Sequence, residues 1–339
     1  MEEKTINCTI ISPMFSYGAY NGVRGKSEFR TSELKGLMRY TYRIACPAES
    51  KTLSDDEKRL FGGAAGSGSH HSGADGRTAA EYASPVRLSI REDGTSRNTD
   101  VLLLHGKRDR NPALNYIASG DIQIIARMSC AATRRAKISE KEIGLDWYTD
   151  LITLALTLFG LGKRSRKGRG NVAVQELTFT NKAEAAEWIC RKLNRVAKTS
   201  EAPRQGDLYT ISGQGIYSKL NQEGCKRLRR PLIRRIEFGG RLDQEQVGKY
   251  LRAIDKASHD TKCSKVKKDR EKQATGWAGR GERLASPLIV SLMRTVEGIY
   301  PVYTFVHAVL GSSVIDEDLR EREEFVRTVE KYFKEEVKG

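Results

Sequence analysis

Hydrophobic and polar residues alternate near the start of the chain, with Ile6, Cys8 and Ile10 on one face and polar residues on the other. A period of two is typical of a strand that buries one face, so the pattern predicts a strand over residues 5–11.

The next regular pattern has the period of a helix, with Leu34, Leu37 and Met38 on one face. Ser32 precedes this pattern and is a candidate N-cap, and Glu33 places an acidic side chain in the first turn. We therefore expect an amphipathic helix that begins after Ser32.

The same helix carries a basic stripe, because Lys35, Arg39 and Arg43 recur every four residues. Like charges at this spacing repel by a few tenths of a kcal/mol per pair unless an anion neutralises them. Gly36 lies beside the stripe, and glycine inside a helix costs about 1 kcal/mol relative to alanine. These features favour a ligand or another backbone close to this face. An ordinary solvent-facing helix is the alternative.

Further patterns complete an ordered series in the first half. They predict strands over residues 86–91, 101–104, 122–128 and 172–179, a helix over 147–159 that is apolar on all sides, a flexible loop over 61–77 and a basic, turn-rich insertion over 106–120. The helix should be buried and end at Gly160, acting as a C-terminal cap. The series strand, helix, strand, strand, helix, strand predicts a ferredoxin-like βαββαβ unit and an α+β fold.

The second half is less regular. It predicts a helix over residues 182–198, a hairpin of strands 283–293 and 301–309, and a closing helix over 316–338. A second α/β unit with many insertions is the simplest interpretation. The expected domains are therefore residues 1–180 and 181–339.

A Gly-rich basic loop joins the buried helix to the next strand. It holds four glycines and five cations without an acid: Gly160, Gly162, Lys163, Arg164, Ser165, Arg166, Lys167, Gly168, Arg169 and Gly170. Glycines let a backbone present its N–H groups to an anion at close range, and the cations add opposite charge. The loop therefore suits a phosphate backbone, and a solvated flexible connection is the alternative.

Composition agrees with a polyanionic partner. The chain of 339 residues has 59 Lys and Arg against 43 Asp and Glu, a net charge of +16. Nucleic acid and an anionic membrane surface both fit that balance. No apolar run is long enough to span a membrane, so a soluble cytoplasmic protein is expected. Six scattered cysteines and five histidines predict no disulfides, metal site or cofactor.

Five segments together resemble the RAMP superfamily, and within it the family of first subunits of the Cmr effector, the type III-B CRISPR-Cas complex. They are Ser12-Pro13-Met14-Phe15, residues 29–40, Leu60-Phe61-Gly62-Gly63, residues 160–170, and residues 283–288 with the sequence RLASPL. The resemblance covers the first half well and the second half through one motif.

The resemblance implies two tandem ferredoxin-like, RRM-related domains in an RNA-guided antiviral complex. Members of the family bind RNA near the 3′ part of the guide and are not credited with cutting it. The implied partners are guide RNA, target RNA and other Cmr or RAMP subunits. By position, Lys35 and Arg39 correspond to the helix that faces the RNA, and residues 160–170 to the loop that touches its backbone.

The leading interpretation is thus a non-catalytic RNA-binding subunit. The expected phosphate ligands are the loop cations with Ser165, the stripe of Lys35, Arg39 and Arg43, and Arg30 and Arg283 lining the same cleft. Gly36 and the loop glycines would let the RNA backbone approach. Because base pairing to a guide reads the sequence, contacts to the RNA backbone would suffice.

Three alternatives remain open. The first is a metal-independent endoribonuclease of the same superfamily that processes guide precursors, for which His105 is the best candidate acid or base. The second is a module whose basic faces meet acidic protein surfaces. The third is another RAMP subunit.

Overall fold

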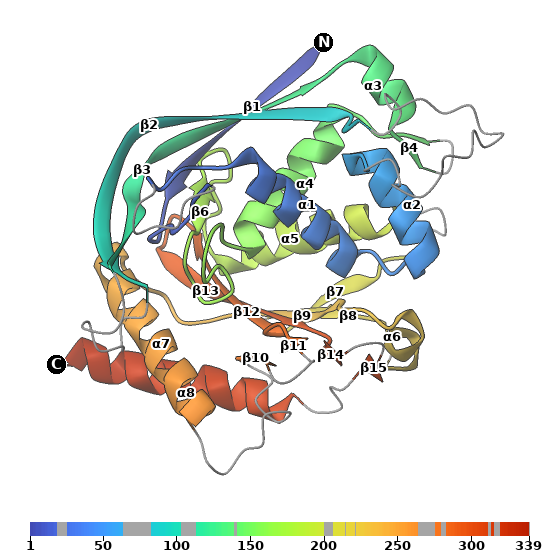
Figure 1. Cartoon of the computed structure of the whole chain (residues 1–339). Helices are drawn as coiled ribbons and strands as arrows, with labels where there is room; N and C mark the ends of the chain where they lie inside the picture. Colours follow the sequence, from blue (N-terminus) through green and yellow to red (C-terminus); the bar gives the residue numbers. More distant parts are fainter. Residues whose placement is uncertain are drawn as a thin grey trace.

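The computed structural model places two antiparallel sheets on either side of a shared layer of helices (Figure 1). It describes residues 1–18, 26–63, 83–102, 113–138, 141–199, 206–213, 215–220, 222–263, 275–278, 283–310, 313–314 and 319–338. His70, His71 and His105 lie outside the described residues, as does most of the predicted flexible loop.

The first sheet has the strand order β2-β3-β1-β6, with every neighbouring pair antiparallel. Its strands are β1 (Glu2–Ile10), β2 (Val86–Val101), β3 (Ala113–Met128) and β6 (Val172–Val174). Helix α1 (Thr31–Ala45) follows β1, and α4 (Leu145–Leu158) precedes β6. This is the order and pairing of a βαββαβ unit. Smaller elements interrupt it, namely α2 (Ser50–Phe61), α3 (Cys130–Arg135), β4 (Lys137–Ile138) and β5 (Lys141–Glu142).

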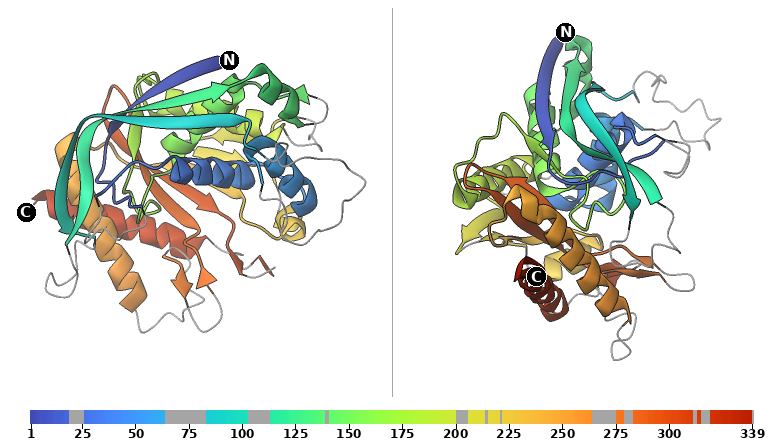
Figure 2. Two further views of the ribbon diagram at one scale, coloured as in Figure 1. Left: turned by 45° about the horizontal axis from the view of Figure 1, so that its top comes forward. Right: turned by 90° about the vertical axis from the view of Figure 1, so that its left-hand side faces the viewer.

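The hairpin of β2 and β3 is longer than the sequence predicts. Figures 1 and 2 show it curling from the first sheet down one side of the molecule. Residues 113–120, expected to be turn-rich, are strand paired with β2. A bulge near Ser96 bends the hairpin, and Gly120 beside it has a φ of +119°. The β2 part of this segment is polar and exposed, so hydrophobic alternation gave no signal for it, whereas Leu114 and Ile117 of β3 are buried.

Helix α1 confirms the expected apolar face in part, since Leu34 and Met38 are buried and Leu37 is half-buried. It begins at Thr31, and the residue before it, Arg30, makes no side-chain cap. The expected N-cap role of Ser32 is therefore wrong. The acidic Glu33 in the first turn still favours the start of the helix through the helix dipole.

Helix α4 is buried on nearly all sides, as its sequence predicts, because it touches both sheets through β1, β3, β6 and β12 (Leu288–Arg294). It ends at Leu158 with Phe159 in an extended conformation, so Gly160 is not its left-handed cap.

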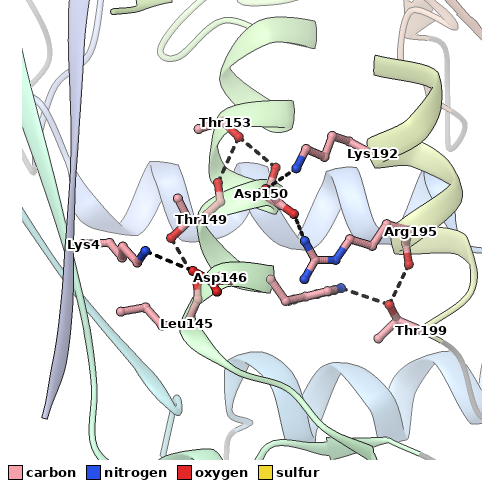
Figure 3. A network of polar contacts seen from close by, with 10 residues as sticks. Lys4, Leu145, Asp146, Thr149, Asp150, Thr153, Lys192, Arg195 and Thr199 are labelled. Carbon is pink, nitrogen blue, oxygen red and sulfur yellow. Dashed lines mark hydrogen bonds and ion pairs between the residues drawn. The ribbon is translucent and has the colours of Figure 1, made fainter. Parts of the chain in front are cut away.

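Helix α5 (Lys182–Ala197) packs beside α4, and a polar network joins the two (Figure 3). The Asp150 carboxylate of α4 accepts hydrogen bonds from Lys192 Nζ, at 2.6 Å, and from Arg195 of α5. On the other side of α4, Lys4 of β1 lies 3.2 Å from Asp146. Helix α4 is thus tied by charge to a strand and to a neighbouring helix.

The second sheet has five strands in the order β12-β13-β9-β8-β7. They are β7 (Tyr209–Ser212), β8 (Gly215–Ser218), β9 (Ile233–Phe238), β12 and β13 (Ile299–Val306). The expected hairpin of the two late strands is confirmed, with Leu288 opposite Phe305. The sheet differs from a second βαββαβ unit, because the place beside β9 is taken by β8, which precedes β9 in the chain.

Two helices cover the outer face of the second sheet, α7 (Val247–Cys263) and α8 (Arg320–Lys338) (Figures 1 and 2). Phe325 and Val329 of α8 are buried, whereas Val337 near the end of the helix is exposed. The remaining elements are α6 (Gln222–Leu228), the 3-10 turn Gln244–Gln246, β10 (Trp277–Ala278), β11 (Arg283–Leu284), β14 (Val309–Leu310) and β15 (Ser313–Val314).

One large hydrophobic core joins the two halves. Ile6 and Met38 from the first unit belong to the same buried cluster as Ile236 and Val302 from the second sheet. The expected boundary at residue 180 falls just before α5, and the core continues across it. The α1, α4 and α5 layer is therefore shared by both sheets.

Candidate nucleic-acid interface

The ends of the Gly-rich loop run against each other. The Leu161 N–H donates to the Gly170 carbonyl at 2.9 Å, and the Gly170 N–H donates to the Pro13 carbonyl at 3.0 Å. A Cβ on Gly160 would lie 2.0 Å from the Arg169 oxygen, and one on Gly170 would lie 1.8 Å from the Leu161 oxygen. These glycines allow the chain to approach its own backbone, not a ligand.

The other two loop glycines also serve packing inside the protein. Gly162 has a φ of +83°, and a Cβ there would meet the Phe15 oxygen at 2.6 Å. Gly168 has a φ of +77° and packs against Leu251 of α7. The predicted role of the four loop glycines in approaching RNA therefore does not match their surroundings.

The middle of the loop is bound to the second sheet. The Val290 N–H of β12 donates to the Arg166 carbonyl at 3.1 Å, and the Gly168 N–H donates to the Val290 carbonyl at 2.8 Å. The loop thus connects the first unit to β12 and is not a free, solvated connection.

Two of the loop cations form an ion triad with one buried carboxylate. Arg169 is 2% exposed and Asp255 of α7 is 0% exposed. The Arg169 guanidinium donates to both Asp255 oxygens, at 3.1 and 2.6 Å, and Arg164 donates to one of them. A buried carboxylate needs such partners because desolvation of an unpaired charge is expensive. Arg164 and Arg169 are therefore corrected from phosphate ligands to ties between the loop and α7.

Lys167 is also turned inward, being 8% exposed. Its Nζ lies 3.3 Å from Ser286 Oγ and 4.6 Å from the centre of the Phe325 ring. Burial lowers the pKa of Lys167 to about 7. A lysine that is only partly charged at neutral pH is a weak phosphate ligand, so this prediction is corrected too.

Lys163, Ser165 and Arg166 remain available from the loop. Lys163 is exposed, with its Nζ 4.9 Å from the centre of the Tyr17 ring. Arg166 is half-buried, donates to the Ser286 carbonyl at 2.6 Å and stacks over Tyr40 at 4.8 Å. Ser165 and Arg166 line the space between the loop and α1, and Lys163 lies outside it.

Two of the three cations in the basic stripe of α1 bind other parts of the protein. Arg39 donates to the carbonyls of Phe61 and Gly62, at 2.9 and 2.5 Å, and so holds the end of α2. Arg43 is ion-paired with Glu57 of α2.

Lys35 makes no ion pair within the described residues and is half-buried. Burial and, to a lesser extent, the neighbouring Arg39 lower the pKa of Lys35. Arg30 donates to the Tyr17 carbonyl at 2.8 Å and keeps 37% of its side chain exposed. Among the described cations of this helix and its N-cap, Lys35 and Arg30 thus remain candidates for phosphate contact.

A cleft of about 250 Å³ lies between α1 and the loop. The residues that line it are Glu33, Gly36, Leu37, Tyr40, Phe159, Gly160, Leu161, Gly162, Ser165, Arg166 and Ile289. Gly36 faces this open space, because a Cβ there would have no atom within 4 Å. Of the predicted glycines, Gly36 is the one whose absent side chain leaves room for something other than the protein.

Sequence reasoning missed Glu33 and Tyr40 as site residues. Ser16 Oγ donates to Glu33 Oε2 at 2.6 Å, and burial raises the pKa of Glu33. Burial also raises the pKa of Tyr40. The signal was present, since Glu33, Gly36, Leu37 and Tyr40 follow one another at helical spacing on one face of α1.

Several sequence predictions are not decided by this geometry. Arg283 belongs to β11, but its side chain lies outside the described part of the structure, as does His105. No histidine is among the described residues that line the cleft.

Within the described ranges, no group of three or more His, Cys, Asp or Glu side chains is arranged to hold a metal ion. No described helix is both long and apolar enough to cross a membrane. All six cysteines are described, and none is in a disulfide.

Comparison with known proteins identifies the family. Residues 7–173 match the sequence model of the RAMP superfamily. No curated protein sequence gives a match. Cmr1 from Pyrococcus furiosus in its apo form has the same fold, with a TM-score of 0.52 and 13% identity over 98% of this chain and 97% of that chain.

Two chains from cryo-EM structures of the type III-B Cmr-beta complex bound to cognate target RNA are also similar. One, determined with AMPPnP and in the presence of ssDNA, has a TM-score of 0.54 and 11% identity, covering 98% of each chain. The other has a TM-score of 0.52 and 10% identity, covering 97% of this chain and 99% of that one. At these identities the likeness shows a shared fold. Because the family match includes both α1 and the Gly-rich loop, the chain belongs to the RAMP superfamily.

Proposed function

We propose that this protein is the first subunit of a type III-B Cmr effector and binds RNA there without cutting it. Its family and its fold, which it shares with Cmr1 and with chains of Cmr-beta along nearly their full lengths, support the assignment. The Cmr-beta structures contain cognate target RNA. The net charge of +16 suits the same partner, because phosphate backbones bind cations with release of counterions.

The observation that carries the proposal is the open cleft between α1 and the loop. Gly36 lines the cleft without a side chain, and Lys35 lies on the same helix outside the lining residues. Arg166 lines the opposite side and Lys163 lies on the same loop, whose other cations are buried or paired with Asp255. These three cations, with Arg30 beyond them, form the proposed phosphate-binding rim.

The rim is rigid, which favours binding. The loop is fixed to β12 by two backbone hydrogen bonds and to α7 by the Asp255 triad. A rigid site loses little conformational entropy when a ligand binds. The buried loop cations therefore act on RNA indirectly, by holding Lys163 and Arg166 in place.

The proposed ligands are guide RNA and target RNA near the 3′ part of the guide, and the proposed partners are the other subunits of the complex. The rim cations are backbone ligands, which suits a system in which base pairing to a guide supplies sequence reading. No cleavage step is proposed, and no histidine is among the described residues that line the cleft.

The first experiment measures the affinity of the purified chain for single-stranded RNA at fixed salt. The triple variant Lys35→Ala, Lys163→Ala, Arg166→Ala should bind at least tenfold more weakly. The matched control removes the same charge from α8 through Arg327→Ala, Lys331→Ala and Lys334→Ala, three exposed positions on the outermost layer, and should bind normally. An equal loss of RNA affinity in both variants would contradict specific RNA binding by the rim cations.

The same preparation tests the rivals. RNA incubated with the chain in EDTA should remain intact. Cleavage that His105→Ala abolishes would instead identify an endoribonuclease. If the rim variant binds RNA normally but no longer joins the other subunits, the rim is a protein-binding surface.

A further inference from the structure

The cleft between α1 and the loop has apolar walls. Leu37, Tyr40, Phe159 and Ile289 line it, and the rings of Tyr40 and Phe159 meet edge to face with centroids 5.7 Å apart. Its volume of about 250 Å³ is below the ~300–1,000 Å³ typical of pockets for whole small-molecule ligands. This space suits a flat, apolar ring system smaller than a complete nucleotide.

Polar groups stand at opposite ends of the cleft. Glu33 and Tyr40 are seven residues apart on α1, which corresponds to about 10 Å along the helix axis. The Glu33 carboxylate, one of whose oxygens is held by Ser16 at 2.6 Å, is a hydrogen-bond acceptor. The Tyr40 hydroxyl is buried and donates to no acceptor among the described residues, while the Arg166 guanidinium above its ring supplies only further donors.

Gly36 makes this space possible. An alanine there would stabilise the helix by about 1 kcal/mol and would touch nothing within 4 Å. A glycine thus lowers helix stability at a position of α1 where a longer side chain would reach into the cleft.

We propose that the cleft takes one unpaired nucleobase of the bound RNA, a base that carries an exocyclic amino group. This inference rests on the proposed RNA-binding function. The base lies between the apolar walls, its amino group donates to Glu33, and a ring nitrogen or carbonyl at its other end accepts from the Tyr40 hydroxyl. Cytosine, adenine and guanine present both groups, whereas uracil lacks the amino donor.

The cleft does not suit the phosphate group of a nucleotide. A phosphate inside it would face apolar side chains and the Glu33 carboxylate, whose charge repels it, with Arg166 as the one cation among the described lining residues. The rim cations Lys35 and Lys163 lie outside the lining residues, where the backbone can pass while one base turns inward. Proteins that bind single strands commonly combine such a backbone track with stacking of individual bases.

The test compares oligocytidine, oligouridine and oligocytidine with abasic sites, all of one length, bound to the full-length chain. Wild type should bind oligocytidine about tenfold more tightly than the other two. Gly36→Met should lower the affinity for oligocytidine to the level for oligouridine, because the longer side chain fills the cleft. Gly36→Ala is the matched control and should retain at least half of the preference.

Two further variants test the roles of the polar groups. Glu33→Gln should raise affinity for oligouridine several-fold, because an amide can donate to a uracil carbonyl. Tyr40→Phe should weaken oligocytidine several-fold without changing the melting temperature by more than a few degrees. Either variant leaving the base preference unaltered would contradict the assigned role of that side chain.

The two proposals fail in different ways. If RNA binds and depends on Lys35, Lys163 and Arg166, but cytidine, uridine and abasic strands bind equally and Gly36→Met binds normally, the cleft takes no base and RNA binding stands. If no strand binds, or binding ignores the rim cations, the proposed function itself is wrong. If Gly36→Met instead blocks assembly with other subunits, the cleft receives a protein side chain.

Discussion

The contacts of single residues explain why the Gly-rich loop, whose sequence resembles a phosphate-binding loop, mainly packs against the rest of the protein. Each loop glycine has protein atoms where its side chain would stand, and two of the five cations share one buried carboxylate. Residue types alone cannot distinguish an anion-binding loop from a tightly packed one, because both need glycine and charge. The distinguishing feature is Asp255, which is 86 residues distant from Arg169 in the chain.

Two glycine substitutions should therefore have opposite effects on stability. Gly170→Ala places a Cβ 1.8 Å from the Leu161 oxygen at a φ of +70°, and should lower the free energy of unfolding by at least about 2 kcal/mol. Gly36→Ala should raise it by about 1 kcal/mol. Urea unfolding of the two variants and wild type measures both effects. Equal effects in the two variants would contradict the packing assigned to the loop.

Lys167 should make stability depend on pH. Its pKa of about 7 in the fold is below the ordinary value of 10.5, so between these values the unfolded chain holds the extra proton. Stability should therefore rise with pH across this window, and the cost of burying the charge is complete below pH 7. Lys167→Met removes that cost.

The measurement is urea unfolding of wild type and Lys167→Met from pH 6 to pH 10. The advantage of the variant should be largest at pH 6 and shrink toward pH 10, a change on the order of a few kcal/mol. Parallel pH profiles for the two proteins would show that Lys167 is not buried as described.

At the level of elements, the first sheet could be predicted well from the sequence. Alternation located β1, helical spacing located α1, and apolar residues on all sides identified α4 as buried. Three features of the fold were not predicted. The outer half of β2 is polar on both faces, and α7 went unpredicted although Tyr250, Leu251 and Ile254 recur at helical spacing. The position of β8 beside β9 depends on long-range pairing that no local pattern encodes.

The site was predictable to a similar extent. The sequence located α1, Gly36 and the loop, but it assigned Arg39 and Arg43 to RNA when their partners, the end of α2 and Glu57, are contributed by the next helix. A basic stripe shows where charge gathers and not what neutralises it. Glu33 and Tyr40 were overlooked because an acid and a tyrosine do not resemble phosphate ligands.

The link between the loop and α7 should be one of the strongest polar contacts between elements. Asp255→Ala would leave the buried Arg169 and the mostly enclosed Arg164 without their shared partner, at a cost of about 3–5 kcal/mol. The control is Asp146→Ala, whose carboxylate is 76% exposed and pairs with Lys4 on the surface, with an expected cost of at most about 1 kcal/mol. Chemical denaturation compares them, and similar losses would argue against the buried triad.

At the scale of the whole molecule, the loop links the first unit to the second sheet and its outer helices. The Val290 backbone of β12 forms hydrogen bonds with the loop, and Asp255 of α7 forms ion pairs with it. The rim cations are therefore set by contacts from both halves of the chain. Neither half alone would present the complete rim.

The most direct test of the account is the salt dependence of RNA binding. Each phosphate contact on a single strand contributes about 0.7 to the slope of log K against log salt, so Lys35→Ala, Lys163→Ala and Arg166→Ala together should reduce that slope by about 2. The α8 control, Arg327→Ala, Lys331→Ala and Lys334→Ala, should keep the wild-type slope. An unchanged slope in the rim variant, or an equal reduction in the control, would contradict RNA binding between α1 and the Gly-rich loop.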